Sequence, residues 1–168
     1  DIFLLEGITG SGKTEVYLKL IESVLSQGKK VLILVPEITL IGPMSQRLKA
    51  ISPHLSIFHS RLSEGERFDA YEAILSHQSR IILGTRSAAL IPIDTLGLIV
   101  VDEAHDGAYK QTDGIYYDAI EALKIRATYH QIPLILGSAT PSIPAMYEAK
   151  QGNYHLIELT ERANKQKQ

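Results

Sequence analysis

The stretch Gly7-Ile8-Thr9-Gly10-Ser11-Gly12-Lys13-Thr14 decides the fold of this chain, because it matches the phosphate-binding pattern G-x-x-x-x-G-K-[ST]. It follows an apolar run over residues 2–5 and precedes a helical pattern, which is the strand–loop–helix context of a P-loop. The glycines let successive N–H groups face a phosphate, and the positive end of the helix faces the same anion. Lys13 would then reach the β- and γ-phosphates of a nucleotide, and the Thr14 hydroxyl would hold Mg²⁺.

The composition suits one domain with a sizeable core, since the chain has 168 residues of which 45% are hydrophobic. The net charge of −2 excludes a broad positive field, so any contact with nucleic acid must use a local groove. The absence of cysteine excludes disulfides and thiolate zinc sites. Without a long apolar run or a signal-peptide pattern, we expect a cytoplasmic protein that does not contact a membrane.

Strand and helix patterns alternate along the chain, and the strands are continuous apolar runs rather than alternating ones. This pattern predicts an α/β fold whose mostly parallel sheet is covered by helices on both faces. The expected strands are residues 2–5, 31–35, 55–58, 80–83, 98–101, 134–136 and 154–159. The expected helices are residues 14–27, 41–51, 63–76, 118–129 and 143–149, and residues 106–117 are expected to form a loop.

Two of these helices have apolar faces that predict how they pack. The inward stripe expected for the first helix comprises Val16, Leu20, Ile21, Val24 and Leu25. The third helix should begin at a capping box, Ser63-Glu64-Gly65-Glu66. Its expected inward residues are Phe68, Tyr71, Ile74 and Leu75.

The polar motifs gather where strands end. In parallel sheets, ligands bind outside the carboxyl ends of the strands. At such ends the sequence places the P-loop, Pro36-Glu37, His59-Ser60, residues 84–88, residues 102–105 and residues 137–141. Among them, Asp102 can hold the Mg²⁺ that Thr14 also binds, and Glu103 can orient a water toward the γ-phosphate.

The combined motifs resemble a known family. Asp102-Glu103-Ala104-His105 and Ser138-Ala139-Thr140, behind a P-loop, resemble motifs II and III of superfamily 2 helicases. The primosomal replication-restart helicases are more similar still, over about residues 4–159. The residues that carry this closer resemblance are 5–17, 35–40, 59–60, 84–88, 137–141 and Tyr109-Lys110-Gln111. The resemblance implies a three-layer, RecA-like P-loop NTPase lobe over residues 1–160, the first of two such lobes.

The same resemblance implies a set of site residues for ATP and Mg²⁺. The nucleotide-binding residues are Gly7, Thr9, Gly10, Ser11, Gly12, Lys13 and Thr14, with Thr14 and Asp102 as Mg²⁺ ligands. The catalytic residues are Lys13, Asp102, Glu103 and His105. His105 and the hydroxyls of Ser138 and Thr140 would couple the nucleotide site to the nucleic-acid groove, although a histidine at this position can also belong to an ordinary loop.

The resemblance also implies a path for DNA. The phosphodiester backbone would be contacted by Pro36, Glu37, Thr85, Arg86 and Ser87, which suits sequence-independent positioning of a strand. Residues 106–117 correspond to the family's aromatic-rich loop, in which Tyr109, Tyr116 and Tyr117 would stack on bases and Lys110 would meet phosphate. Alternatives remain open, since Pro36 can simply end a strand, Arg86 can form a surface ion pair, and the tyrosines can pack on the lobe or face another domain.

Two positions depart from the family pattern. Alanine stands at position 104, where the family usually has glutamate, and this change puts little in doubt. After the aromatic loop the family usually has Tyr-x-Ala-Arg-Asp, whereas this chain has Tyr117-Asp118-Ala119-Ile120-Glu121. The role of the missing arginine is therefore not assigned to Ile120.

The implied function is that of a bacterial 3′-to-5′ DNA helicase that restarts stalled replication forks by coupling ATP hydrolysis to movement along a single strand. Its implied partners are single-stranded and forked DNA, primosome loader proteins and single-strand-binding protein. Both chain ends suggest an excised domain, with residues 161–168 as a polar tail or linker toward a second lobe. The arginine finger and the zinc site of the family would lie outside this chain, so the lobe alone should have little activity. The alternatives are another superfamily 2 translocase, such as a fork-remodelling or restriction motor, and an inert P-loop docking module.

Overall fold

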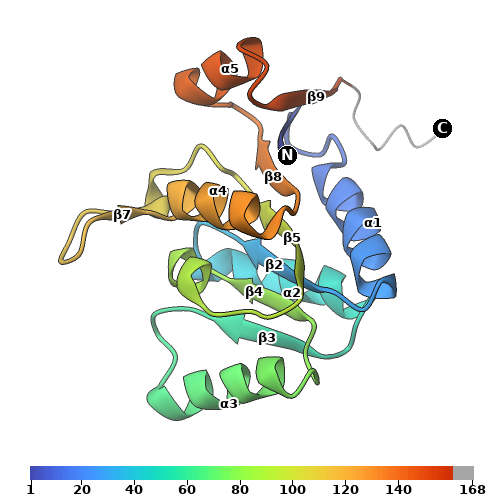
Figure 1. Cartoon of the computed structure of the whole chain (residues 1–168), viewed down its shortest axis with the longest axis vertical. Coiled ribbons are helices and arrows are strands. Elements are labelled where there is room, and N and C mark those ends of the chain that lie inside the picture. Colours follow the sequence, from blue (N-terminus) through green and yellow to red (C-terminus); the bar gives the residue numbers. More distant parts are fainter. Residues whose placement is uncertain (161–168) are drawn as a thin grey trace.

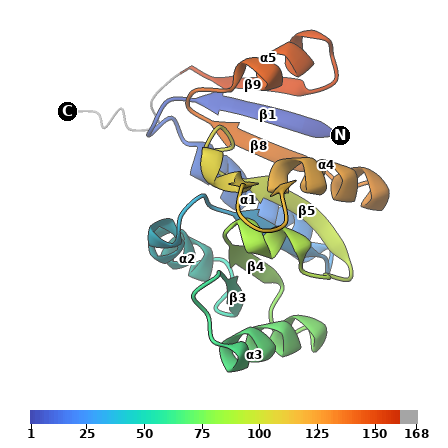
Figure 2. The ribbon, with the colours of Figure 1, turned by 90° about the vertical axis from the view of Figure 1, so that its left-hand side faces the viewer.

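A parallel sheet forms the centre of the computed structural model, which describes residues 1–160 (Figure 1 and Figure 2). Over these residues the sheet has seven strands in the order β3-β4-β2-β5-β8-β1-β9. Their bounds are β1 (Ile2–Gly7), β2 (Lys30–Leu34), β3 (Leu55–Phe58), β4 (Ile81–Gly84), β5 (Leu96–Val101), β8 (Leu134–Ser138) and β9 (His155–Leu159). Each neighbouring pair is parallel, so every carboxyl end lies at one edge. The tail expected at residues 161–168 lies outside the described residues.

The central strands are buried along their whole length, as their uninterrupted apolar sequences predict. Every residue of β2, β4, β5 and β8 is buried. Leu32 pairs with Ile82 on one side and Ile99 on the other, which places three apolar side chains in one row of the core. Parallel strands of this kind need a cover on both faces.

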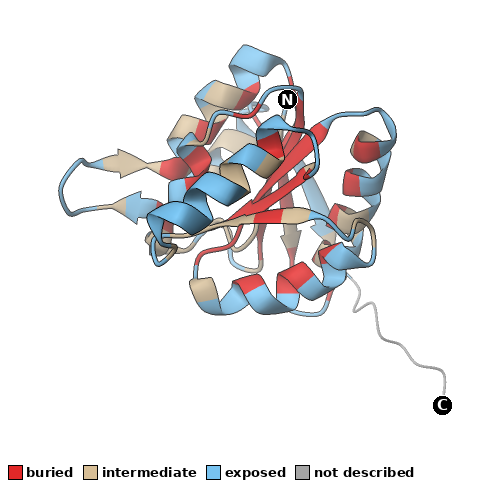
Figure 3. Cartoon of the chain, turned by 90° about the horizontal axis from the view of Figure 1, so that it is seen from below, coloured by how far each residue is buried: buried red, intermediate tan, exposed pale blue. Residues whose placement is uncertain are grey.

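Helices supply that cover on both faces, which confirms the three-layer α/β fold. The helices α1 (Lys13–Ser26) and α2 (Ile41–Lys49) pack on one face. The other face carries α4 (Ala119–His130) and the 3₁₀ turn η2 (Arg86–Leu90). The helices α3 (Glu64–Leu75) and α5 (Ile143–Lys150) lie toward the two ends of the strand order, near β3 and β9 (Figure 1). Figure 3 shows the buried strands in red between helices whose outer faces are exposed.

The buried stripe of α1 differs in part from the expectation. Ile21 and Leu25 are buried as predicted, but Leu20 is 36% exposed. The stripe begins instead with Lys13 and Tyr17, which are both buried and lie one helical turn apart. Positions four residues apart share a helix face, so Lys13, Tyr17, Ile21 and Leu25 form one buried stripe.

The third helix begins as predicted but packs less deeply. Ser63 and Glu66 form the expected capping box, with the Glu66 N–H donating to Ser63 Oγ at 3.3 Å and the Ser63 N–H donating to Glu66 Oε2 at 2.8 Å. The expectation that Phe68 and Leu75 point inward is wrong, because they are 65% and 53% exposed. Ile74 is the buried residue of α3. Since α3 lies at the end of the sheet, only a narrow stripe of it meets the core.

The segment expected to be a loop over residues 106–117 contains short regular elements. The 3₁₀ turn η3 (Gly107–Tyr109) leads into a two-stranded antiparallel pair, β6 (Lys110–Gln111) and β7 (Tyr117–Asp118). This hairpin is formed by only two residues on each side, too few for a strand pattern to be recognised in sequence.

None of the helices formed by residues 1–160 is long and apolar enough to span a membrane.

Candidate functional site

The P-loop connects β1 to α1 at the carboxyl edge of the sheet. Glycine suits its positions for different structural reasons. Gly10 and Gly12 have φ angles of 81° and 95°, in the left-handed region that favours glycine. Gly7 has a different constraint, because a Cβ there would lie 2.3 Å from Ser11 Oγ. Glycine at these positions therefore suits the tight curl of the loop.

Lys13 is folded over this loop. Its ammonium donates a hydrogen bond to the Gly7 carbonyl oxygen at 2.6 Å, and it lies 3.8 Å from Glu103 Oε1. The side chain is only 8% exposed. The P-loop lysine and the second carboxylate of the acidic motif thus face one another across the site.

The residues of this loop fit a nucleotide phosphate. A cavity of about 430 Å³ is lined by Thr9, Lys13, Thr14, Asp102 and Glu103, among others. Within residues 1–160, the buried Ser11 hydroxyl oxygen has no hydrogen-bond partner. A buried polar atom without a partner is costly in a folded protein. The Ser11 hydroxyl lies against Gly7 and is not part of the cavity lining, so the fit to a phosphate rests on Lys13 and on the groups beside it. Thr14 with Asp102 offers the oxygen ligands that Mg²⁺ prefers.

Asp102 is held by its backbone and by its carboxylate at the end of β5. Its N–H donates to the Leu34 carbonyl at 2.9 Å, and its own carbonyl accepts from the Tyr109 hydroxyl at 2.6 Å. Its Oδ1 accepts from the Tyr17 hydroxyl at 3.1 Å. Burial, and then the neighbouring Glu103 carboxylate, raise the pKa of Asp102, whereas the Tyr17 hydroxyl lowers it.

Glu103 has a φ of 47°, in the left-handed region that non-glycine residues seldom adopt. The turn that follows it is tied to β8, because the Ala104 N–H donates to the Gly137 carbonyl at 2.8 Å. From this turn the carboxylate of Glu103 reaches to 3.8 Å from the Lys13 ammonium.

His105 and Ser138 meet as the motif pattern suggests. His105 Nδ1 and Ser138 Oγ form a hydrogen bond of 2.8 Å, and Glu103 Oε2 lies 3.6 Å from the same ring nitrogen. Thr140 joins this group through its backbone N–H, which donates to Ser138 Oγ at 3.1 Å. The acidic motif and the Ser-Ala-Thr motif are therefore in direct contact across β5 and β8.

Residues 1–148 match the family model described as DEAD/DEAH box helicase. The chain belongs to the DEAD/DEAH box helicase family. It is 43% identical to the replication restart protein PriA of Bacillus subtilis (strain 168) over 97% of this chain and 20% of that protein. The PriA of Haemophilus influenzae is 41% identical over 97% of this chain and 22% of its own length. The resemblance to replication-restart helicases is thus confirmed, and the chain spans about a fifth of the length of these relatives.

Solved structures agree on the fold of this helicase lobe. A DEAD box protein from Methanococcus jannaschii superposes with a TM-score of 0.70 at 20% identity, covering 98% of this chain and 46% of that one. The helicase domain of Pyrococcus furiosus Hef gives a TM-score of 0.63 at 22% identity, covering 96% of this chain and 35% of that one. At such identities the likeness supports the RecA-like fold alone.

The residues expected to contact the DNA backbone lie at the same edge of the helicase lobe but differ in exposure. Pro36 and Thr85 are buried, whereas Glu37 and Ser87 are exposed. Arg86 donates through Nη1 to the carbonyls of Ala108 and Lys110, at 3.2 and 2.8 Å. The arginine thereby fixes the base of the β6–β7 hairpin, and its contact with DNA stays a prediction.

The three tyrosines expected to stack on bases have different surroundings. Tyr109 is 1% exposed, so its ring cannot meet a base in this arrangement, and the expectation for it is corrected. Its hydroxyl instead holds the Asp102 carbonyl. Tyr116, which directly precedes β7, is 76% exposed. Tyr117 is half-buried, with its hydroxyl 3.5 Å from the Arg86 carbonyl, while Lys110 is exposed and lies 3.9 Å from Asp118 Oδ2.

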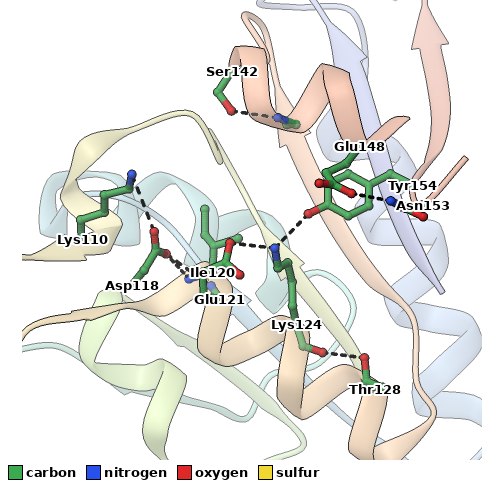
Figure 4. A network of polar contacts seen from close by, with 11 residues as sticks. Lys110, Asp118, Ile120, Glu121, Lys124, Thr128, Ser142, Glu148, Asn153 and Tyr154 are labelled. Carbon is green, nitrogen blue, oxygen red and sulfur yellow. Dashed lines mark hydrogen bonds and ion pairs between the residues drawn. The ribbon is translucent and has the colours of Figure 1, made fainter. Parts of the chain in front are cut away.

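Ile120, for which the family resemblance implies an arginine, lines a second cavity of about 340 Å³. Lys124 lies beside it and donates to Glu121 Oε1 at 2.7 Å and to the Tyr154 hydroxyl at 3.1 Å (Figure 4). The half-buried Ile120 also packs against the core. The position is thus apolar, next to a cation supplied by the following turn of α4.

Sequence reasoning assigned no site role to Tyr17, nor to Arg47, which lines the cavity beside the P-loop. The Tyr17 hydroxyl reaches Asp102, which lies 85 positions away in the sequence. The available signal was its spacing, because Tyr17 lies four residues after Lys13 and so on the same helix face.

Proposed function

We propose that this chain is the ATP-binding lobe of a DNA helicase that restarts stalled replication forks. One observation carries the proposal most directly. Lys13 and Glu103 oppose each other 3.8 Å apart, in a cavity that Thr14 and Asp102 also line. This is the arrangement needed to bind a triphosphate and to place a water at its last phosphate. The similarity to PriA proteins supports the choice of process.

Each side chain has a distinct task in this proposal. Lys13 would exchange the Gly7 carbonyl for phosphate oxygens, and Thr14 and Asp102 would hold Mg²⁺. The bound metal supplies positive charge that offsets the charge of the phosphates. Glu103 would orient the attacking water and accept its proton. The His105–Ser138 hydrogen bond would carry the state of this site toward β8.

DNA would cross the carboxyl edge of the sheet. Contacts from Glu37, Arg86 and Ser87 to the phosphodiester backbone would hold a DNA strand without regard to its sequence. Lys110 offers an exposed cation. The ring of Tyr116 is available for stacking. By similarity to PriA, we propose translocation from 3′ to 5′ and, as partners, primosome loader proteins and single-strand-binding protein.

The proposal is tested with the full-length protein that carries this lobe. We expect Mg²⁺-dependent ATP hydrolysis that single-stranded DNA stimulates, and unwinding of a partial duplex with a 3′ tail but not of one with a 5′ tail. A fork with a 3′ end at the branch should bind more tightly than a blunt duplex of equal length. A rate of ATP hydrolysis that single-stranded DNA does not change, or preferred unwinding of duplexes with 5′ tails, would contradict the proposal. The isolated lobe should hydrolyse ATP only slowly, since the arginine finger belongs to a second lobe.

Replacing Tyr116 with alanine is expected to weaken single-stranded DNA binding by about 1–3 kcal/mol, the usual worth of one stacked base. The reason is that this exposed ring offers a stacking surface that alanine lacks. Fluorescence anisotropy with a labelled oligonucleotide, at one fixed salt concentration, measures the change.

The matched control for this experiment is Tyr129→Ala. Tyr129 is also strongly exposed, at 83%, but lies near the carboxyl end of α4 rather than on the hairpin. Its removal should leave DNA affinity within about twofold. Equal losses for both variants would show that Tyr116 has no special role.

A further inference from the structure

The side chain of Tyr17 is placed unusually for a core aromatic. The residue is 1% exposed, and its hydroxyl donates to Asp102 Oδ1 at 3.1 Å. It lies one turn after Lys13, on the same face of α1. A single helix face therefore provides both the phosphate-binding ammonium and a hydrogen bond to the carboxylate expected to bind the metal.

The Tyr17 hydroxyl faces Gly137 of β8, which has no side chain. A Cβ at Gly137 would lie 1.6 Å from the Tyr17 hydroxyl oxygen and 2.8 Å from Cζ. Any side chain at position 137 would therefore force the tyrosine away from Asp102. The carbonyl of Gly137 also accepts the Ala104 N–H at 2.8 Å, so the same residue holds the acidic turn.

Asp102 is half-buried at the end of β5 and is followed directly by Glu103. The Tyr17 hydroxyl donates to the charged form and fixes the direction of the carboxylate. The Tyr109 hydroxyl fixes the backbone of the same residue from the other side.

We infer that Tyr17 is a positioning residue that orients Asp102 toward Mg²⁺, and that residue 137 must be glycine so that the Tyr17 ring can reach that carboxylate. The inference rests on the proposed role of Asp102 as a metal ligand. It joins the P-loop helix, β5 and β8 through one hydroxyl group. A displacement of β8 at Gly137 would thereby shift the Tyr17 hydroxyl and, with it, the carboxylate of Asp102.

The test uses Tyr17→Phe in the full-length protein, since this change removes one oxygen and keeps the ring. Binding of a fluorescent ATP analogue is titrated against Mg²⁺, and separately measured in EDTA. We expect the Mg²⁺ concentration for half-maximal binding to rise about five- to tenfold, with binding in EDTA unchanged within about twofold. The matched control is Tyr154→Phe, another buried tyrosine, whose hydroxyl contacts Lys124 instead, and it should leave both values unchanged.

A second variant, Gly137→Ala, approaches the same contact from β8 and should also raise the Mg²⁺ requirement. Combined with Tyr17→Phe it should add little, because both changes break one hydrogen bond. A Tyr17→Phe protein with a wild-type Mg²⁺ requirement would overturn the inference and leave Tyr17 as core packing. If the affinity of the wild-type protein for the nucleotide does not depend on the Mg²⁺ concentration, the proposed function is overturned, and the inference with it.

Discussion

Replacing Asp102 with asparagine is expected to lower ATP hydrolysis by the full-length protein about 10³-fold, and also to raise the melting temperature of the nucleotide-free lobe. The loss of activity would follow from losing the charge of the carboxylate that we propose as a Mg²⁺ ligand, since a catalytic metal contributes several kcal/mol to the stabilisation of the transition state. The two effects have opposite signs because the charge that serves catalysis opposes folding.

The gain in stability comes from the surroundings of Asp102. Burial and the Glu103 carboxylate raise its pKa, so its charged form is disfavoured in the folded protein. Asparagine removes the charge and keeps an oxygen that can accept the Tyr17 hydroxyl. For a protein domain of this size, each kcal/mol gained corresponds to about 2–4 °C in melting temperature.

The control for this experiment is Lys13→Ala, which should also abolish hydrolysis but should not stabilise the protein. It removes a buried side chain and its hydrogen bond to the Gly7 carbonyl, and it leaves Glu103 without its cation. A lower melting temperature for Asp102→Asn would contradict our account of the site. Unchanged hydrolysis in Lys13→Ala would favour an inert docking module instead.

Replacing Lys30 with alanine is expected to lower the free energy of unfolding by about 3 kcal/mol, in the range for large-to-small changes in a core. Lys30 begins β2 and is 0% exposed. Its ammonium donates to the Ile74 carbonyl, in the last turn of α3, at 2.6 Å and pairs with Asp94. Alanine would leave a cavity and remove the cation from the carboxyl end of a helix. Denaturant unfolding of the lobe measures the loss.

The matched variant Lys30→Met keeps the buried stem and should cost less than the alanine change. It also tests the charge through pH, because the hydrogen bond from Lys30 lowers the pKa of Asp94. That contribution is present above the ordinary aspartate pKa of about 3.9 and is lost as the pH falls toward the lowered value. Between pH 6 and pH 3, wild-type stability should therefore fall more steeply than that of Lys30→Met. Equal slopes would show that the pair contributes nothing.

Much of the fold could be predicted because its determinants are contiguous in the sequence. The P-loop is eight adjacent residues, and its glycine angles are the ones that the pattern requires. Strands such as β5, and β2 after Lys30, are unbroken apolar runs, which identify buried parallel strands without any knowledge of their neighbours. The carboxyl-edge rule then placed Asp102 and Ser138 near Lys13 before any distance was known.

The errors fall where a side chain's surroundings come from distant segments. Phe68 suits the inward pattern of its helix, yet α3 lies at the end of the sheet and leaves this ring exposed. Tyr109 lies in a polar segment, yet its ring is buried in the hydrophobic core and its hydroxyl donates to the Asp102 carbonyl. Sequence shows the spacing along one element, but not which side of that element the rest of the chain covers.

By itself, the sequence determined the P-loop, the parallel α/β architecture and the acidic and Ser-Ala-Thr motifs, because each depends on residues a few positions apart. Only the tertiary structure decided which groups meet. The strand order β5-β8-β1 brings Asp102, Gly137 and the P-loop to one edge, and α1 then places Tyr17 against both. The hydroxyl of Tyr17 and the backbone of Gly137 acquire their roles from this packing, since neither residue type indicates one when considered alone.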